Sequence, residues 1–421
     1  MAAAFCWGGQ FAASFSSFHL RKDMNCRRRI LIHDYSGHPF QVELSRCLAE
    51  RGHQVFHVHS ESFQTPKGDL TNRSDDPTSL QIAGVRLDGV FHKNSFLRRR
   101  SQEIETGRLV AVQIQQFRPE VVISSNAPLD TQAVIYKATR AIGAKFVFWL
   151  QDIYSEAIGR ILPRKLPVLG SLVAKRYRKL EYDLLRGSDH IVAITDDFVP
   201  FLCNNGVSTH DISVIENWAP LNDVSAQGRA KPGNGTIHAV YAGTLGYKHN
   251  PEVLLSAAKA LTVTIDVLSE GRAADELAHR AKTEGITNLV VRPWVRFSDL
   301  PGVLADADIL IAMIEADAGI FSVPSKVLTY LCSGKPVLAA IPAGNLARRI
   351  LEREQAGLVS EPGNHADFVT NFRQLAERAE VRAKLGANGR AYAERSFGID
   401  RIADRFEGIL ERLFLMELQA K

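Results

Sequence analysis

Two loops in the second half of this chain combine glycines, hydroxyl groups and lysines in patterns that suit a diphosphate. The first, residues 240–252 (VYAGTLGYKHNPE), follows an apolar run and precedes a predicted helix. Its small and basic residues are Gly243, Thr244, Gly246 and Lys248. A turn of small residues lets the backbone approach a phosphate closely, and a cation neutralises its charge. A glycine turn beside a surface lysine would have the same composition, so this loop is a candidate that depends on its context.

The second loop, residues 315–342, predicts a helix that begins at a ligand. Pro324 favours the first helical turn, where its missing N–H would have no partner anyway. The N–H groups and the dipole of such a turn attract anions. The hydroxyl and ammonium groups here belong to Ser322, Ser325 and Lys326. Glu315 ends the preceding apolar run and could orient a ligand hydroxyl, although a serine-capped helix with nothing bound would give the same pattern.

Two segments of the first half carry polar side chains directly after apolar runs. Residues 33–40 (HDYSGHPF) place Gly37 in a strand-to-helix loop beside His33 and His38. Such a loop offers backbone N–H groups to an anion, and a structural turn with solvated histidines is the alternative. Asp152 could position a reacting hydroxyl group, as could either histidine, or Asp152 could cap the next helix.

Alternating strands and helices must position these residues. The first half predicts strands over 29–35, 54–60, 85–90, 121–126 and 145–152, with helices over 41–52, 106–117 and 131–143. The second half predicts strands over 238–244, 264–270, 288–294, 307–314 and 336–341, with helices over 251–261, 325–334 and 397–414. This alternation indicates an α/β fold of two doubly wound, Rossmann-like domains with parallel sheets. Ligands bind at the carboxyl ends of such strands, so we expect the chemistry in a cleft between the two domains.

The length of 421 residues agrees with two domains, because it is about twice what one hydrophobic core usually serves. We expect a first domain over 27–225 and a second over 236–395. Residues 396–421 predict a helix that packs back on the first domain. Residues 1–26 read as a disordered N-terminal extension.

Charge and composition exclude several classes of protein. The net charge of +5 is too small to indicate nucleic acid binding. The spacing of the five cysteines suits neither a disulfide framework nor a set of metal ligands. Asp306 and Asp308 are explained as surface positions beside a buried strand. No metal site is therefore expected. Apolar runs of about 18 residues are missing, which together with the cysteines favours a cytoplasmic location. The missing GxGxxG fingerprint disfavours an NAD-dependent enzyme.

Basic and apolar residues alternate over residues 164–179. The basic residues are Arg164, Lys165, Lys175, Arg176, Arg178 and Lys179, and the apolar ones are Leu166, Val168, Leu169, Leu172 and Val173. A basic, apolar helix suits an anionic membrane surface, although a solvated helix face would have similar charges. The run Arg98–Arg100 is interpreted as a solvated face.

Six segments of the chain, in this order, resemble one family. They are HDYSGHPFQVELSRCLAERGH, VIENWAP, YAGTLGYKHNPE, LSEGRAADEL, VPSKVLTYLCSGKPVLAAIP and AGLVSEPGN. From about residue 27 onward the chain is similar to family 4 of the glycosyltransferases with the GT-B fold. More narrowly, it resembles the WcaI-like enzymes of colanic acid and other exopolysaccharide synthesis.

This resemblance implies a retaining transfer of a sugar from a GDP- or UDP-linked nucleotide-sugar, without an obligatory metal. The first domain would bind the acceptor and the second the donor. The implied binding residues are Gly37, Asn217, Gly243, Thr244, Gly246, Lys248, Glu270, Gly271, Ser322, Pro324, Ser325 and Lys326. The catalytic candidates are Asp152, His38 and Glu315. The Pro-Ser-Lys variant is similar to a subgroup acting on lipid-linked intermediates, which implies a polyprenyl-diphosphate-linked acceptor at the inner face of the plasma membrane.

The chain departs from the family at one point. Most members carry two glutamates, separated by seven residues, where this sequence has Phe321 and Thr329. Glu315 could substitute for them. Two alternatives stay open: a GT-B-like sugar-nucleotide epimerase, which would need several carboxylates around the sugar, and a catalytically inactive nucleotide-sugar-binding protein, which would lose acceptor-side polar residues such as Asp152.

Overall fold

The computed structural model describes residues 27–419, apart from 64–66, 90, 93–94, 126, 225–234, 247–248 and 317–324. The N-terminal segment 1–26 and the predicted site residues Lys248, Ser322 and Pro324 therefore lie outside the described residues. Among the helices of the described part, none is long and apolar enough to cross a membrane.

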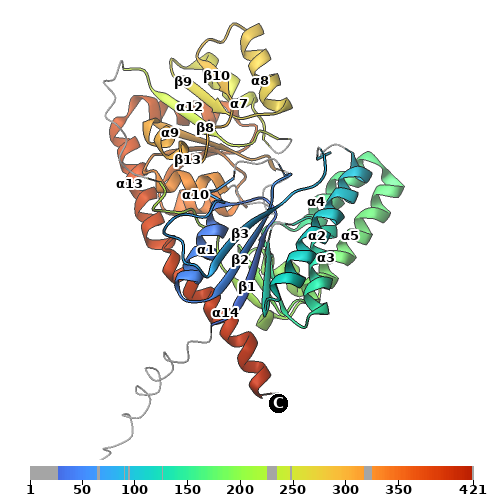
Figure 1. Ribbon diagram of the computed structural model, residues 1–421. Coiled ribbons are helices and arrows are strands. Elements are labelled where there is room, and N and C mark those ends of the chain that lie inside the picture. Colours follow the sequence, from blue (N-terminus) through green and yellow to red (C-terminus); the bar gives the residue numbers. More distant parts are fainter. Residues whose placement is uncertain are drawn as a thin grey trace, which may run out of the picture.

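The first domain is a parallel sheet of seven strands in the order β3-β2-β1-β4-β5-β6-β7. The strands are β1 (Arg29–Asp34), β2 (Gln54–Ser60), β3 (Leu80–Val85), β4 (Val121–Ser125), β5 (Lys145–Leu150), β6 (His190–Ala193) and β7 (Ile212–Val214). The helices are α1 (Pro39–Glu50), α2 (Phe96–Phe117), α3 (Leu129–Ala141), α4 (Tyr154–Lys165), α5 (Pro167–Gly187) and α6 (Phe198–Asn204), with a 3₁₀ turn at Thr209–Asp211. In Figure 1, α2, α3 and α5 lie on one face of this sheet and α1 lies on the other.

The second domain is a parallel sheet of six strands in the order β10-β9-β8-β11-β12-β13. The strands are β8 (His238–Ala242), β9 (Thr264–Leu268), β10 (Leu289–Arg292), β11 (Ile309–Met313), β12 (Val337–Ala340) and β13 (Gly357–Ser360). The helices are α7 (Glu252–Ala260), α8 (Arg272–Thr283), α9 (Leu300–Asp306), α10 (Ser325–Cys332), α11 (Leu346–Arg353), α12 (His365–Glu377) and α13 (Ala379–Ser396). The predicted architecture of two doubly wound, Rossmann-like parallel sheets is therefore confirmed.

One predicted strand is wrong. The sequence predicts a strand over residues 85–90, whereas β3 ends at Val85. The register of the sheet explains the difference, because β3 pairs with β2 from Val55–Leu80 to Ser60–Val85 and β2 itself ends at Ser60. β3 is the edge strand, so its side chains are only partly buried and its apolar pattern is weak.

The C-terminal helix α14 (Ile399–Gln419) runs along the first domain (Figure 1). Arg51, at the end of α1, contacts three carboxylates of this helix, from Asp400, Asp404 and Glu407, at 3.2, 2.7 and 2.5 Å. Phe406 of α14 packs edge-on against Trp149 of β5, with ring centroids 5.0 Å apart. The chain thus returns to its first domain after completing the second.

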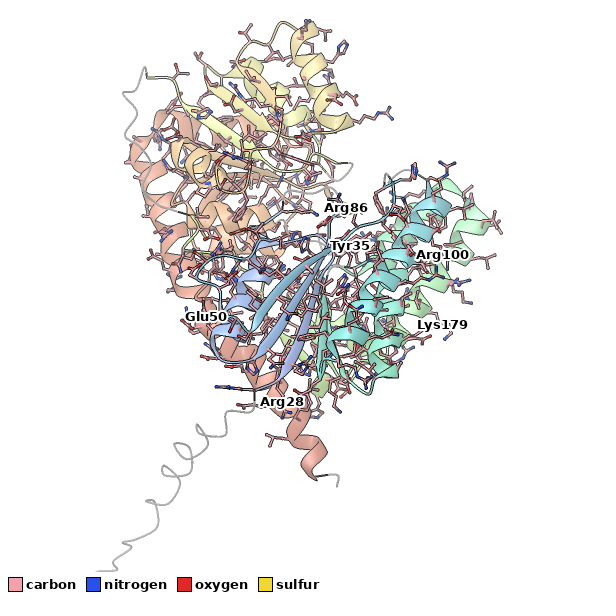
Figure 2. The ribbon with its side chains drawn as sticks, in the orientation of Figure 1. Arg28, Tyr35, Glu50, Arg86, Arg100 and Lys179 are labelled. Atoms are coloured by element: carbon pink, nitrogen blue, oxygen red, sulfur yellow. The ribbon has the colours of Figure 1, made fainter. Side chains whose placement is uncertain are left out.

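The carboxyl edges of the two sheets face each other. Asp197 follows β6 of the first sheet, and Arg349 lies on the helix that follows β12 of the second. Their side chains form an ion pair at 2.6 Å. Figure 2 agrees: Arg28, at the start of β1, is far from the second domain, whereas Tyr35, just after its end, points toward it.

Candidate functional site

The strand order of the second sheet reverses between β8 and β11, its two central strands. Successive connections run outward from this point on both sides, which opens a crevice at the carboxyl ends of the two strands. Gly243 follows β8, and Glu315 follows β11 and is partly buried. Two of the segments singled out in the sequence therefore reach the same crevice.

Gly243 and Lys326 are in contact at this crevice. The backbone of Gly243 has φ +135°, which disfavours any other residue. A β-carbon at Gly243 would lie 3.2 Å from both Cε and Nζ of Lys326. The missing side chain is therefore what allows the lysine of α10 to lie against the loop after β8.

Tyr241 and Tyr330 hold this arrangement together. The ammonium of Lys326 lies 3.7 Å from the ring centroid of Tyr241, a cation–π contact. The Tyr241 hydroxyl donates to the carbonyl of Thr244 at 2.8 Å. The Tyr330 hydroxyl accepts the N–H of Ala242 at 2.9 Å and donates to its carbonyl at 3.2 Å. Two buried tyrosines thus fix α10 against the end of β8.

The end of β9 supplies a second wall of the crevice. Ser269 accepts the N–H of Leu245 through its hydroxyl at 2.9 Å, so it shapes the glycine loop. Glu270 is exposed and accepts the N–H of Trp294 at 3.2 Å, and Gly271, with φ +100°, begins α8. In the loop after β8, Gly246 donates its N–H to Nδ1 of His249 at 3.0 Å. Ser325, the first residue of α10, is exposed.

The strand order of the first sheet reverses between β1 and β4. Asp34, the last residue of β1, is completely buried, and its carboxylate accepts the N–H groups of Ser36 at 3.0 Å, Gly37 at 2.9 Å and His38. Gly37 has φ +78°, and a β-carbon there would lie 2.8 Å from Leu70. Asp34 is the residue that builds this loop, and reasoning from the sequence missed it.

The two histidines of this loop differ. His33 is completely buried, and its Nδ1 lies 2.9 Å from the hydroxyl of Ser124. Burial lowers its pKa to about 3, and the nearby His59 adds to the effect. His33 is therefore a neutral imidazole in the interior of the domain, and its expected role in positioning a reacting group stays a prediction. His38 is only partly buried and stays at the sheet edge.

Asp152 follows β5 at the same edge and is partly buried. The expected alternative, a helix cap, is wrong: α4 begins after Ile153, and its first N–H groups are taken by Glu181 of α5. The Glu181 carboxylate accepts the N–H of Tyr154 at 2.9 Å and of Ser155 at 3.0 Å. Burial raises the pKa of Glu181 to about 7, although these hydrogen bonds oppose the shift. Its distance in sequence from α4 gave no local signal of this role.

Asn217 lies where the chain leaves the first domain. Its side-chain amide and that of Gln151 donate to each other, at 2.6 and 3.2 Å. The next residue, Trp218, stacks on Trp149 with ring centroids 5.9 Å apart and donates its indole N–H to Glu43 at 2.6 Å. Asn217 is therefore part of a packed junction between the end of β5 and the segment that crosses to the second domain.

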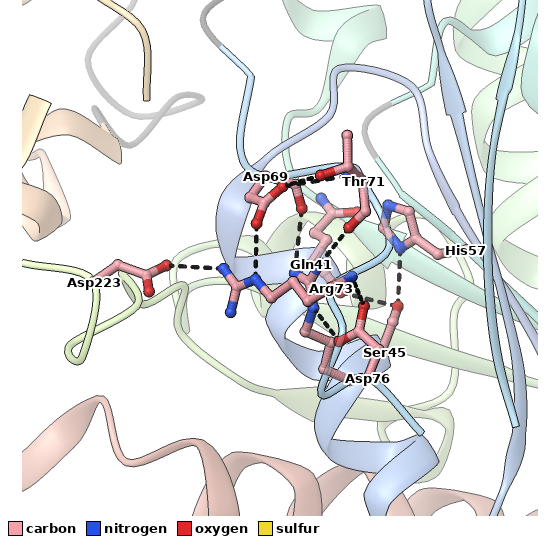
Figure 3. Close-up of polar contacts among 9 residues, drawn as sticks. Gln41, Ser45, His57, Asp69, Thr71, Arg73, Asp76 and Asp223 are labelled. Atoms are coloured by element: carbon pink, nitrogen blue, oxygen red, sulfur yellow. Dashed lines mark hydrogen bonds and ion pairs between the residues drawn. The ribbon is translucent and has the colours of Figure 1, made fainter. Parts of the chain in front are cut away.

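Ion pairs on the outer side of α1 strengthen this junction (Figure 3). Arg46 contacts Asp76 at 2.8 Å, and Arg73 contacts Asp69 at 2.7 Å and Asp223 of the crossing segment at 4.0 Å. A pocket of about 190 Å³ lies here, between α1 and Phe297 of the second domain. None of the predicted site residues lines it, so we assign this pocket to the junction and not to the crevices.

Comparison with known proteins agrees with this geometry. Residues 38–218 match the family described as "Glycosyl transferase 4-like domain", and residues 236–378 match "Glycosyl transferases group 1". The chain therefore belongs to the glycosyltransferases of the GT-B type that combine these two domains. A search of curated protein sequences finds no matching relative.

Solved structures share the fold at low sequence identity. Sucrose-phosphate synthase from Thermosynechococcus elongatus is 12% identical with a TM-score of 0.72, covering 93% of this chain and all (100%) of that one. HepE from Anabaena in complex with UDP is 15% identical with a TM-score of 0.65, covering 91% and 100%. A trehalose-6-phosphate protein from E. coli bound with UDP-2-fluoro glucose is 11% identical with a TM-score of 0.66, covering 91% and 98%.

Proposed function

We propose that this glycosyltransferase transfers a sugar, with retention of configuration, from a UDP- or GDP-linked nucleotide-sugar to a polyprenyl-diphosphate-linked glycan in the synthesis of an exopolysaccharide or other surface polysaccharide. One observation carries the donor half of the proposal: Gly243 and Lys326 meet at the crevice between β8 and β11. A backbone turn and an ammonium group at one point suit a diphosphate. HepE, which shares the fold, forms a complex with UDP, and this supports the choice of ligand.

In this mechanism the second domain holds the leaving group. Lys326 and the N-terminus of α10 stabilise the negative charge that develops on the diphosphate as the bond to the sugar breaks. Gly246 and Ser325 complete the cradle, and Lys248 is a candidate from the sequence alone. Glu270, Gly271 and Glu315 would contact the nucleoside and the sugar from the ends of β9 and β11. The departing phosphate takes the acceptor proton, so no side-chain nucleophile is required, and we propose no metal.

The first domain presents the acceptor. Asp152 and His38 are the candidates to orient its hydroxyl group, because both are partly buried and follow the carboxyl ends of β5 and β1. Gly37 and Asn217 would shape the first-domain wall of the cleft. We assign no nucleophilic role to any of the four.

We further propose that the first domain rests on the inner face of the plasma membrane. Val168, Leu169 and Leu172 of α5 are large apolar residues that are 76%, 65% and 63% exposed. Lys175 and Arg176, one turn further along the helix, are polar neighbours of this surface. An exposed apolar surface flanked by cations suits an anionic lipid surface. A lipid-linked acceptor would be reached from that position.

The deciding experiment measures nucleotide release from UDP-, GDP- and dTDP-sugars, with and without a polyprenyl-diphosphate-linked acceptor. Wild type is compared with Lys326→Ala and with Lys259→Ala, a matched control that removes an exposed lysine of the same domain from an ion pair with Glu284 at 2.6 Å. Release that needs an acceptor, occurs with one donor and is lost only in Lys326→Ala supports the proposal.

The alternatives give different results in the same assay. Conversion of a donor to its epimer without an acceptor would identify an epimerase. Tight nucleotide binding without turnover on authentic acceptors would identify an inactive binding protein. Equal activity of Lys326→Ala and Lys259→Ala would refute the donor site at α10.

A further inference from the structure

A second exposed apolar surface lies at the start of α2. Phe96 and Leu97, the first two residues of α2, are 50% and 78% exposed. Arg100, one turn later, donates to Asp130 of α3 at 3.1 Å, and Tyr177 of α5 donates to the same carboxylate at 2.5 Å. The start of α2 and the middle of α5 are therefore tied to the same carboxylate of α3.

Arg99 lies between this apolar surface and the sheet edge. Its side chain is 47% exposed, and its Nε donates to Glu103 at 2.7 Å. The charge of Arg99 acts on the phenols of Tyr35, just after β1, and of Tyr154, just after Asp152. Arg99 is thus a cation at the edge where the proposed acceptor residues lie, one helical turn from Phe96.

The geometry of the guanidinium suits a diphosphate. In the described part of the chain, the hydrogen bond from Arg99 to a side chain is the one that Nε makes with Glu103. The two terminal Nη groups can donate parallel hydrogen bonds to one phosphate. Arg100, in contrast, is engaged with the buried carboxylate of Asp130 and serves the packing of the helices.

We propose that Arg99 binds the diphosphate of a lipid-linked acceptor, whose chain lies on the apolar surface formed by Phe96 and Leu97. The inference rests on the proposed function for the identity of the acceptor. It adds a specific binding residue and a direction: lipid at the start of α2, diphosphate at Arg99, and the sugar toward Asp152. Membrane attraction alone would need only diffuse positive charge, whereas this site selects a diphosphate.

The first test measures binding without catalysis. Full-length protein is mixed with neutral phosphatidylcholine vesicles that contain either farnesyl diphosphate or enough phosphatidylglycerol to give the same charge. Wild type should prefer the diphosphate vesicles, and Arg99→Gln should lose this preference by about tenfold, as expected for one charge-assisted contact. Arg108→Gln is the matched control, because Arg108 lies on the same helix and forms a similar pair with Glu105 at 3.1 Å. Equal losses on both vesicle types, or in both variants, would overturn the proposal.

The second test separates this inference from the proposed function. With a lipid-diphosphate acceptor, Arg99→Gln should raise KM for the acceptor about tenfold while leaving KM for the nucleotide-sugar unchanged. Transfer that is normal in Arg99→Gln would refute the role of Arg99 and leave the transferase intact. A preference for diphosphate vesicles that depends on Arg99, in a protein without transferase activity, would uphold the binding site and refute the proposed function. Arg99→Lys keeps the charge but lacks the paired Nη groups, so it should bind phosphatidylglycerol vesicles normally and should not recover the preference for diphosphate vesicles.

Discussion

Substitution of Gly243 by alanine tests the donor crevice most directly. Two costs are expected. The φ angle of +135° at Gly243 is unfavourable for alanine, and the strain lowers the unfolding free energy by about 1–3 kcal/mol. The new β-carbon would also lie 3.2 Å from Lys326, so the lysine must move by a few tenths of an ångström away from the loop. The first cost lowers stability, and the second disturbs the cation at the proposed diphosphate.

Gly285→Ala separates these two effects. Gly285 follows α8 in the same domain and has φ +68°, but a β-carbon there meets nothing within 4 Å. Both variants should therefore lower the melting temperature, by about 2–4 °C for each kcal/mol of strain in a domain of this size. Only Gly243→Ala should also weaken binding of the nucleotide, by about tenfold.

The assay is isothermal titration with UDP and GDP, performed well below both melting temperatures. The expected result is a normal affinity in Gly285→Ala and a weakened one in Gly243→Ala. If Gly243→Ala binds the nucleotide as tightly as the control while losing the same stability, the contact between Gly243 and Lys326 has no part in binding. The donor site would then have to lie elsewhere on the second domain.

Two other predictions concern the first domain. Burial raises the pKa of Glu43 from its ordinary value of 4.5 to about 7, so the folded protein favours the protonated acid. The contribution of this acid to the unfolding free energy is fully present below about pH 4.5 and is lost as the pH rises through about 7. The unfolding free energy of wild type, relative to Glu43→Gln, should therefore fall by about 2–3 kcal/mol between about pH 5 and pH 8, and a flat difference in denaturant titrations would contradict the burial argument. Leu169→Glu should weaken binding to anionic vesicles by about tenfold, whereas Leu415→Glu, at an exposed leucine of α14, should not; equal effects in co-sedimentation would refute the membrane surface on α5.

The order of strands and helices was readable from the sequence because buried parallel strands appear as apolar runs separated by amphipathic helices. The same reasoning missed β6, β7 and β13, which contain only three or four residues. Runs this short are also found in loops and at helix ends. They lie at or next to an edge of their sheet, where pairing with a neighbouring strand decides their conformation.

The residues at the crevice between β8 and β11 were easier to single out from the sequence than those at the edge of the first sheet, for a physical reason. Glycine loops and helix starts are local patterns, so Gly243 and Lys326 could be singled out before their contact was known. The residues that hold the first-domain edge act over long sequence distances. Glu181 caps α4 from 26 positions away, and Glu43 receives the indole N–H of Trp218 from 175 positions away. A lone glutamate in an amphipathic helix carries no sign of such a partner.

These distant contacts also bear on how the two halves of the cleft act together. Trp218 lies at the crossing between the domains, and its ring and its N–H are both engaged within the first domain. Asn217 is likewise fixed to the end of β5 through Gln151, two residues after Trp149 and directly before Asp152. One of the two chain crossings between the domains is therefore bonded to the end of β5, directly before Asp152. We therefore expect a shift of the second domain to reach Asp152, the proposed acceptor residue, through Asn217 and Gln151.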